Sequence, residues 1–170
     1  PMAQRASKQK RKNSCRDLRE FIALLERTGN LHRISDPFDK NTELMPLVRW
    51  QYQGLPDDQR KAFLFDNVTD SKGTQYDCRV VVGALGASRK IYKLALGLSN
   101  EDGPSAAAER WNQALSHPIA PRRVATGPVK EVIVKGKEIS RPGGGLLRFP
   151  VPISNPGFDG GPFLTAPYVV

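Results

Sequence analysis

Apolar residues follow the 3.6-residue spacing of a helix in four segments of this chain, and apolar runs of strand length lie between them. This alternation constrains the fold, because each helical segment has an apolar face that another element must cover. Helices are expected at about residues 15–28, 42–53, 89–97 and 106–115, and strands at 31–34, 62–68 and 79–83. The pattern predicts an α/β (α+β) fold with N-terminal helices and a small sheet, in which the last two strands pair.

Residues typical of helix ends support these boundaries. Ser14 and Asp17 resemble a capping box before the first helix, and Gly29 is expected to end it. Ser88 is a residue type preferred at the N-cap of a helix. The second helix is expected to place four apolar side chains on its buried face: Leu44, Leu47, Val48 and Trp50.

The pattern changes near residue 120, and helical periodicity is lost from Gly127 onward. Residues 131–139 resemble a hairpin that turns at Gly136, and residues 163–170 have strand character around Pro167. We therefore predict three parts: a basic flexible tail (1–13), an α/β region (14–120) and a second unit (121–170). An apolar strand at the end needs a partner to cover it, so more chain is expected to follow in the native protein.

The formal net charge is +9, which raises the possibility of a nucleic-acid-binding protein. Most of the excess, however, lies between residues 5 and 19, as is typical of a solvated terminus. Nucleic acid is therefore the less favoured partner. No apolar run approaches the ~20 residues of a membrane span and no secretory signal is recognisable, so we predict a cytoplasmic protein without membrane contact.

Few residues suggest chemistry by themselves. His32 and His117 have no metal-ligand spacing and are interpreted as surface imidazoles, and the two cysteines have no CxxC spacing. The glycine turn at residues 83–87 resembles a phosphate cradle only weakly, and close packing is the favoured interpretation. The free amides of the helix N-terminus at Ser88 could also attract an anion, and the sequence does not decide this.

The most unusual segment is 149–153, which has two X-Pro steps, followed by 159–165, which has adjacent glycines. X-Pro steps favour extended backbone, and the glycines allow another group to approach closely. Asp159 is placed to accept hydrogen bonds from nearby backbone amides. From these features alone, a turn that leads into a strand is favoured over a binding segment.

In their order and spacing, several segments together resemble the opening of the UbiD-like decarboxylases. The segments that carry this resemblance are 17–25, 29–34, 64–68, 82–89, 96–97, 149–152 and 159–165. Residues 80–97 are most similar to the branch that contains protocatechuate decarboxylase and other aromatic hydroxy-acid decarboxylases.

The resemblance implies that residues 121–170 begin a split β-barrel resembling flavin-reductase barrels. In complete members this barrel holds prenylated FMN with a divalent metal (manganese) and potassium. The implied reaction is reversible, non-oxidative decarboxylation of an aromatic or α,β-unsaturated acid, with the flavin as electron sink. The family's catalytic and metal-binding residues are expected beyond Val170, so none is assigned here. Only Thr165 and Ala166 match a part that lines the flavin pocket, and we assign them as cofactor-binding.

Three functions are therefore weighed. The first is the N-terminal portion or subunit of a UbiD-like carboxy-lyase, completed by a continuation of the same gene product or by a downstream chain in a homo- or hetero-oligomer. The second is a scaffold subunit of a decarboxylase complex that takes no part in the reaction. The third is a nucleic-acid-binding module that depends on the basic tail.

Overall fold

The computed structural model describes residues 15–163, and its centre is a three-stranded sheet in the order β1–β3–β6. The strands are β1 (Leu31–Ile34), β3 (Ala62–Phe65) and β6 (Val80–Val82). β3 runs parallel to β1 and antiparallel to β6. The predicted α/β (α+β) class is confirmed, each predicted strand range contains one strand of this sheet, and the predicted pairing of the last two is confirmed.

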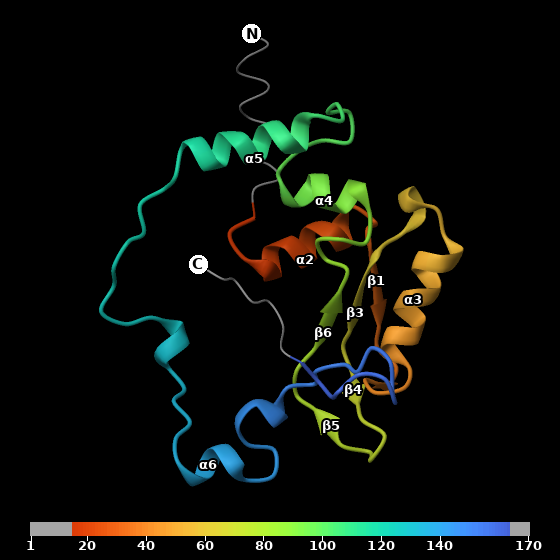
Figure 1. Cartoon of the computed structure of the whole chain (residues 1–170), viewed down its shortest axis with the longest axis vertical. Helices are drawn as coiled ribbons and strands as arrows, with labels where there is room; N and C mark the ends of the chain where they lie inside the picture. The colour runs from red at the N-terminus through yellow and green to blue at the C-terminus, as the bar shows by residue number, and fades with distance from the viewer. Residues whose placement is uncertain (1–14, 164–170) are drawn as a thin grey trace.

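Every residue of β3 is buried, because helices cover both faces of the sheet (Figure 1). Side chains alternate between the faces of a strand. Ala62 accordingly belongs to the hydrophobic cluster under α2 and α4, whereas Phe63 and Phe65 belong to the cluster under α3. This burial on both faces explains why the sequence of β3 is a continuous apolar run.

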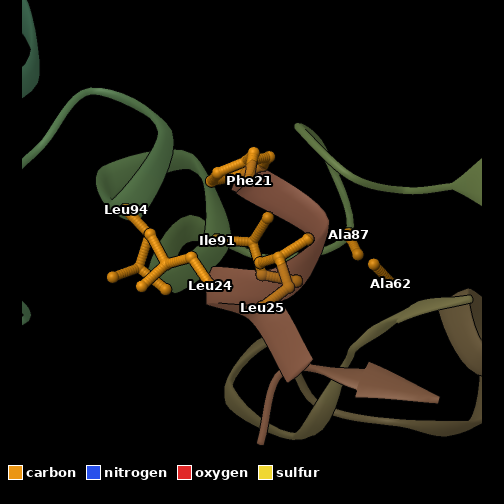
Figure 2. Packing of buried hydrophobic residues seen from close by; sticks show 7 residues of the cluster. All are labelled: Phe21, Leu24, Leu25, Ala62, Ala87, Ile91 and Leu94. Carbon is orange, nitrogen blue, oxygen red and sulfur yellow. The ribbon is translucent and has the colours of Figure 1, made fainter. Parts of the chain in front are cut away.

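Helices α2 (Leu18–Arg27) and α4 (Arg89–Ala95) cover one face of the sheet (Figure 2). The buried side chains of this cluster converge between the two helices and β3: Phe21, Leu24, Leu25, Ala62, Ala87, Ile91 and Leu94. Burying one large apolar side chain of this kind stabilises a fold by about 1.5–3 kcal/mol. The cluster therefore fixes both helices on the sheet.

Side-chain caps set the start of both helices. The Asp17 carboxylate accepts a hydrogen bond from the Glu20 N–H at 2.9 Å, and the Ser88 hydroxyl accepts one from the Ile91 N–H at 3.3 Å. The N-cap of α2 is thus Asp17, and not Ser14 as the predicted capping box required; Ser14 lies outside the described residues. The predicted cap at Ser88 is confirmed.

Helix α3 (Leu44–Gly54) covers the other face, and Leu44 and Val48 are buried as predicted. The prediction that Trp50 faces the core is wrong, because its side chain is 73% exposed. Gln51 is buried in its place. Its amide donates to the Lys61 carbonyl at 2.9 Å and its carbonyl oxygen accepts from the Lys61 N–H at 2.7 Å, so both polar groups are satisfied.

A second small sheet lies at one end of the first and has the order β2–β4–β5. It consists of β2 (Phe38–Asp39), β4 (Val68–Thr69) and β5 (Gln75–Tyr76). The single strand predicted at 62–68 is therefore divided into β3 and the start of β4. The loop predicted between α3 and β3 contains one short 3₁₀ turn, η1 (Asp57–Gln59).

Beyond the sheets, helix α5 (Ala106–Ser116) forms as predicted, and the chain then follows a long arc (Figure 1). The arc contains η2 (Pro128–Lys130), α6 (Lys137–Ser140) and η3 (Gly145–Arg148). The hairpin predicted at 131–139 is wrong, since α6 begins where its second strand was expected.

No strand follows β6 in residues 83–163, the last part of the chain that the structure describes. The split β-barrel predicted for 121–170 therefore stays a prediction. None of the described helices is long and apolar enough to cross a membrane.

Candidate functional site

Residues 150–154, which we call the docked segment, return from the arc and lie against the connection between β2 and α3. Three hydrogen bonds hold the segment there. The Lys40 ammonium donates to the Val151 carbonyl at 3.2 Å, and the Ile153 N–H donates to the Lys40 carbonyl at 3.2 Å. The Arg49 guanidinium donates to the Ser154 carbonyl. The X-Pro segment singled out from sequence is thus attached to the α/β region.

Lys40 is a buried cation, with only 7% of the residue exposed. Besides the Val151 carbonyl, its ammonium contacts the Asn41 side-chain oxygen at 2.9 Å and lies 5.7 Å from the centre of the Tyr76 ring. In the described part of the chain, no ion pair joins Lys40 to a carboxylate. Because a buried charge is costly unless it is hydrogen-bonded, the docked segment supplies part of what stabilises this ammonium.

The turn that carries Lys40 is fixed by Asp39. Its carboxylate accepts hydrogen bonds from the Asn41 N–H at 2.6 Å, the Thr42 N–H at 3.2 Å and the Ser71 hydroxyl at 2.8 Å. Partial burial raises the pKa of Asp39, but these hydrogen bonds outweigh it and hold the pKa below its ordinary value. The carboxylate is therefore ionised when it holds the turn.

A second turn follows the docked segment. The Asn155 N–H donates to the Asp159 carboxylate at 2.7 Å, and the Asp159 N–H donates to the Asn155 carbonyl at 3.0 Å. The predicted role of Asp159 as an acceptor of backbone amides is confirmed. The described chain ends four residues later, so Thr165 and Ala166, the predicted cofactor-binding residues, lie outside the described residues.

The glycine turn at residues 83–87 serves close packing. Gly83 has φ +74°, and a Cβ placed on it would lie 3.0 Å from the Cβ of Ala87 and 3.7 Å from the Cα of Ala62. The helix N-terminus beyond this turn already has an anionic partner, because the Arg89 N–H donates to the Asp57 carboxylate at 3.1 Å. The favoured interpretation is confirmed, and the chain itself supplies the anion beside Ser88.

An apolar groove of about 490 Å³ lies between β1 and α3. Arg33 lines it but is paired with Glu26 and Asp66, each at 3.0 Å. His32 is exposed on the same edge, with its ring centre 5.6 Å from that of Phe63; burial and the charge of Lys61 lower its pKa. His117 is also exposed, so both imidazoles are surface groups as predicted.

Residues 15–163 contain no cluster of side chains suited to a metal ion. No group of three His, Cys, Asp or Glu in this part of the chain could hold a metal. The groove offers apolar walls, and its one arginine, Arg33, is paired with Glu26 and Asp66. The described residues instead attach the docked segment to the α/β region through Lys40 and Arg49.

The family of the chain follows from its match over residues 22–111, which contain both sheets, helices α3 and α4 and parts of α2 and α5. This stretch matches the 3-octaprenyl-4-hydroxybenzoate carboxy-lyase N-terminal domain. The chain belongs to the UbiD family. The resemblance inferred from the sequence motifs is thereby confirmed, and the described α/β region is a UbiD N-terminal domain.

Similar proteins agree with the UbiD assignment. The pyrrole-2-carboxylic acid decarboxylase of Pseudomonas aeruginosa is 33% identical over 147 residues, which are 82% of this chain and 27% of that protein. The UbiD-class enzyme HmfF of Pelotomaculum thermopropionicum, in an evolved dimeric form in complex with prFMN, superposes with a TM-score of 0.63 at 26% identity. The match covers 87% of this chain and 30% of HmfF.

The vanillic acid decarboxylase of Sedimentibacter hydroxybenzoicus, in its open form, superposes with a TM-score of 0.66. At 23% identity this likeness shows a shared fold, and it covers 84% of this chain and 28% of the decarboxylase chain. Across these three relatives, the chain spans 27–30% of their length. It therefore corresponds to the first third or less of a UbiD decarboxylase.

Lys40 and Arg49 were not identified from the sequence as functional residues. Lys40 lies among polar residues before α3, whereas Arg49 lies between apolar residues in the middle of that helix. Nothing in either local pattern distinguishes these side chains from solvated cations. The partners that give them a role are backbone carbonyls 111 and 105 residues further along the chain. Such long-range contacts leave no signal in local spacing.

Proposed function

We propose that this chain is the N-terminal portion of a UbiD decarboxylase that acts with prenylated FMN, a divalent metal (manganese) and potassium. The reaction is the reversible, non-oxidative decarboxylation of an aromatic or α,β-unsaturated carboxylic acid in the cytoplasm. Family membership supports the proposal, and so do relatives that include a decarboxylase of an aromatic acid and an enzyme in complex with prFMN. The portion is catalytically incomplete without the rest of the enzyme.

The observation that carries the proposal is the family match over residues 22–111. The docked segment ends at Ser154, twelve residues before Ala166 in the sequence. Thr165 and Ala166 are proposed to line the flavin pocket, and the docked segment leads toward them from a fixed point on the UbiD domain. The division into a tail (1–13), an α/β region (14–120) and the start of a barrel (121–170) is part of the same proposal. Metal ligands and acid–base groups come from outside residues 15–163, which contain no metal cluster.

The proposed partners are the remainder of the decarboxylase and further copies or subunits. The similar vanillic acid decarboxylase is described with the composition ShVdcCD, and one form of HmfF is dimeric, so assemblies occur among the relatives. The second candidate function is a scaffold subunit of such an assembly. It is favoured by one observation, the lack of a metal-binding cluster among the described residues.

A turnover assay tests the proposal. The complete protein that contains this chain is loaded with prenylated FMN, manganese and potassium, and is incubated with pyrrole-2-carboxylate, vanillate and cinnamate. Carbon dioxide and the decarboxylated product are then measured. We expect release from at least one acid by the complete protein and none by residues 1–170 alone. Turnover by neither sample would contradict the enzyme function and favour the scaffold.

A further inference from the structure

We propose that Lys40 and Arg49 are positioning residues that clamp the docked segment and thereby set where the chain enters the flavin pocket. The clamp itself is inferred from the described contacts. Its effect on flavin rests on the proposed function. The two parts are tested by separate measurements.

The two cations reach the segment from different elements. Lys40 follows β2 directly, and Arg49 lies in the middle of α3. Their targets, the carbonyls of Val151 and Ser154, are three residues apart on one stretch of backbone. Two contacts on one short segment fix both its position and its direction. A single contact would leave the direction free.

The docked segment is suited to this kind of capture. Pro150 and Pro152 have no N–H group, and each favours extended backbone in the residue before it. The Ile153 N–H donates to the Lys40 carbonyl. Main-chain atoms of the segment therefore make all three of its hydrogen bonds with Lys40 and Arg49.

Lys40 is costly to bury, which argues for a specific role. A methionine would fill similar space without a charge, but it would leave the Val151 carbonyl without its donor. The ammonium already contacts Asn41 and Tyr76, so it is held ready for the segment. The site is thus built on the α/β region and completed by residues 150–154.

Amide hydrogen exchange on the chain with Lys40→Met tests the clamp. The readout is the Ile153 amide, whose own acceptor is a backbone carbonyl that the substitution leaves in place. We expect its exchange to accelerate about tenfold or more, because a hydrogen bond to a charged group is lost. Lys72→Met, on an exposed lysine, is the matched control and should leave the Ile153 amide unchanged.

Arg49→Met is the second variant, since it changes a partly exposed position on α3 and leaves the core intact. It should accelerate exchange at Ile153 to a smaller extent, and Arg49→Lys, which keeps a donor, should restore most of the protection. In all variants the amide of Leu64 in β3 should stay protected. Unchanged exchange at Ile153 in both Lys40→Met and Arg49→Met, with Leu64 still protected, would overturn the clamp.

The flavin part is tested in the complete protein. We expect Lys40→Met to raise the dissociation constant for prenylated FMN about tenfold while the unfolding temperature of the α/β region changes little. An unchanged dissociation constant beside faster Ile153 exchange would overturn positioning and leave only the docking. If the unsubstituted complete protein binds no flavin, the proposed function fails, whereas the exchange experiment still decides the clamp.

Discussion

Replacing Gly83 with alanine tests the packing of the UbiD domain at its tightest glycine. Gly83 has φ +74°, where an L-residue costs about 1–2 kcal/mol. The new methyl would also lie 3.0 Å from the Ala87 Cβ. Carbon atoms prefer about 3.5–4.0 Å, so the overlap adds about 1–3 kcal/mol. We therefore expect Gly83→Ala to lower the free energy of unfolding by about 2–5 kcal/mol.

Gly73→Ala is the matched control. Gly73 has φ +79°, but a Cβ there would meet nothing within 4 Å, so only the backbone cost of about 1–2 kcal/mol applies. Urea unfolding measures both losses, with the slope of the free energy against urea as a check on two-state behaviour. Combining Gly83→Ala with Ala87→Gly should cost less than the sum of the single changes. Equal losses for Gly83→Ala and Gly73→Ala would refute the close-packing interpretation.

Three further predictions concern the core, a cap and pH. Leu25→Ala, at a fully buried position, should lower the free energy of unfolding by about 3–5 kcal/mol in urea, whereas Trp50→Ser should cost far less because Trp50 is largely exposed. Asp17→Ala should cost about 1 kcal/mol, measured by thermal unfolding, because α2 loses its N-cap; Asp58→Ala is the control. The folded pKa of Asp39 is lowered, so its contribution to stability is present above the unfolded value of 3.8 and lost as pH falls through the folded pKa. Asp39→Asn should therefore flatten the acid side of the stability profile in urea unfolding.

Each of these predictions has a contradicting result. Equal losses for Leu25→Ala and Trp50→Ser would contradict the described helix faces. Equal losses for Asp17→Ala and Asp58→Ala would contradict the cap. An acid-side slope unchanged by Asp39→Asn would show that the Asp39 hydrogen bonds do not stabilise the turn.

Much of the α/β region was predictable, because its elements have strong local patterns. The apolar positions of α2 repeat at helical spacing, and β3 is a continuous apolar run between turn residues. Which side chains of α3 face the core was only partly predictable. Gln51 is buried in place of Trp50 because its amide pairs with both backbone groups of Lys61, a partner ten residues away. Hydrophobicity alone gives no indication of such a pairing.

The hairpin predicted at 131–139 failed for a different reason. Val132 and Ile133 have high strand propensity, yet both are largely exposed and pair with no strand in the described chain. Strand propensity reflects packing on a half-buried surface, so it does not determine structure where no partner strand is at hand. The candidate site was hidden for a related reason, since Lys40 and Arg49 act on backbone more than 100 residues away.

Binding of prenylated FMN tests the central claim most directly. The cofactor is titrated anaerobically, with manganese and potassium, into residues 1–170 alone and into the complete protein that contains them, and binding is followed by absorbance. We expect saturable binding only in the complete protein, because this chain spans only 27–30% of the length of its relatives and residues 15–163 contain no metal-binding cluster. Saturable binding by residues 1–170 alone would contradict the claim that this chain is incomplete, and no binding in either sample would contradict its place in a decarboxylase.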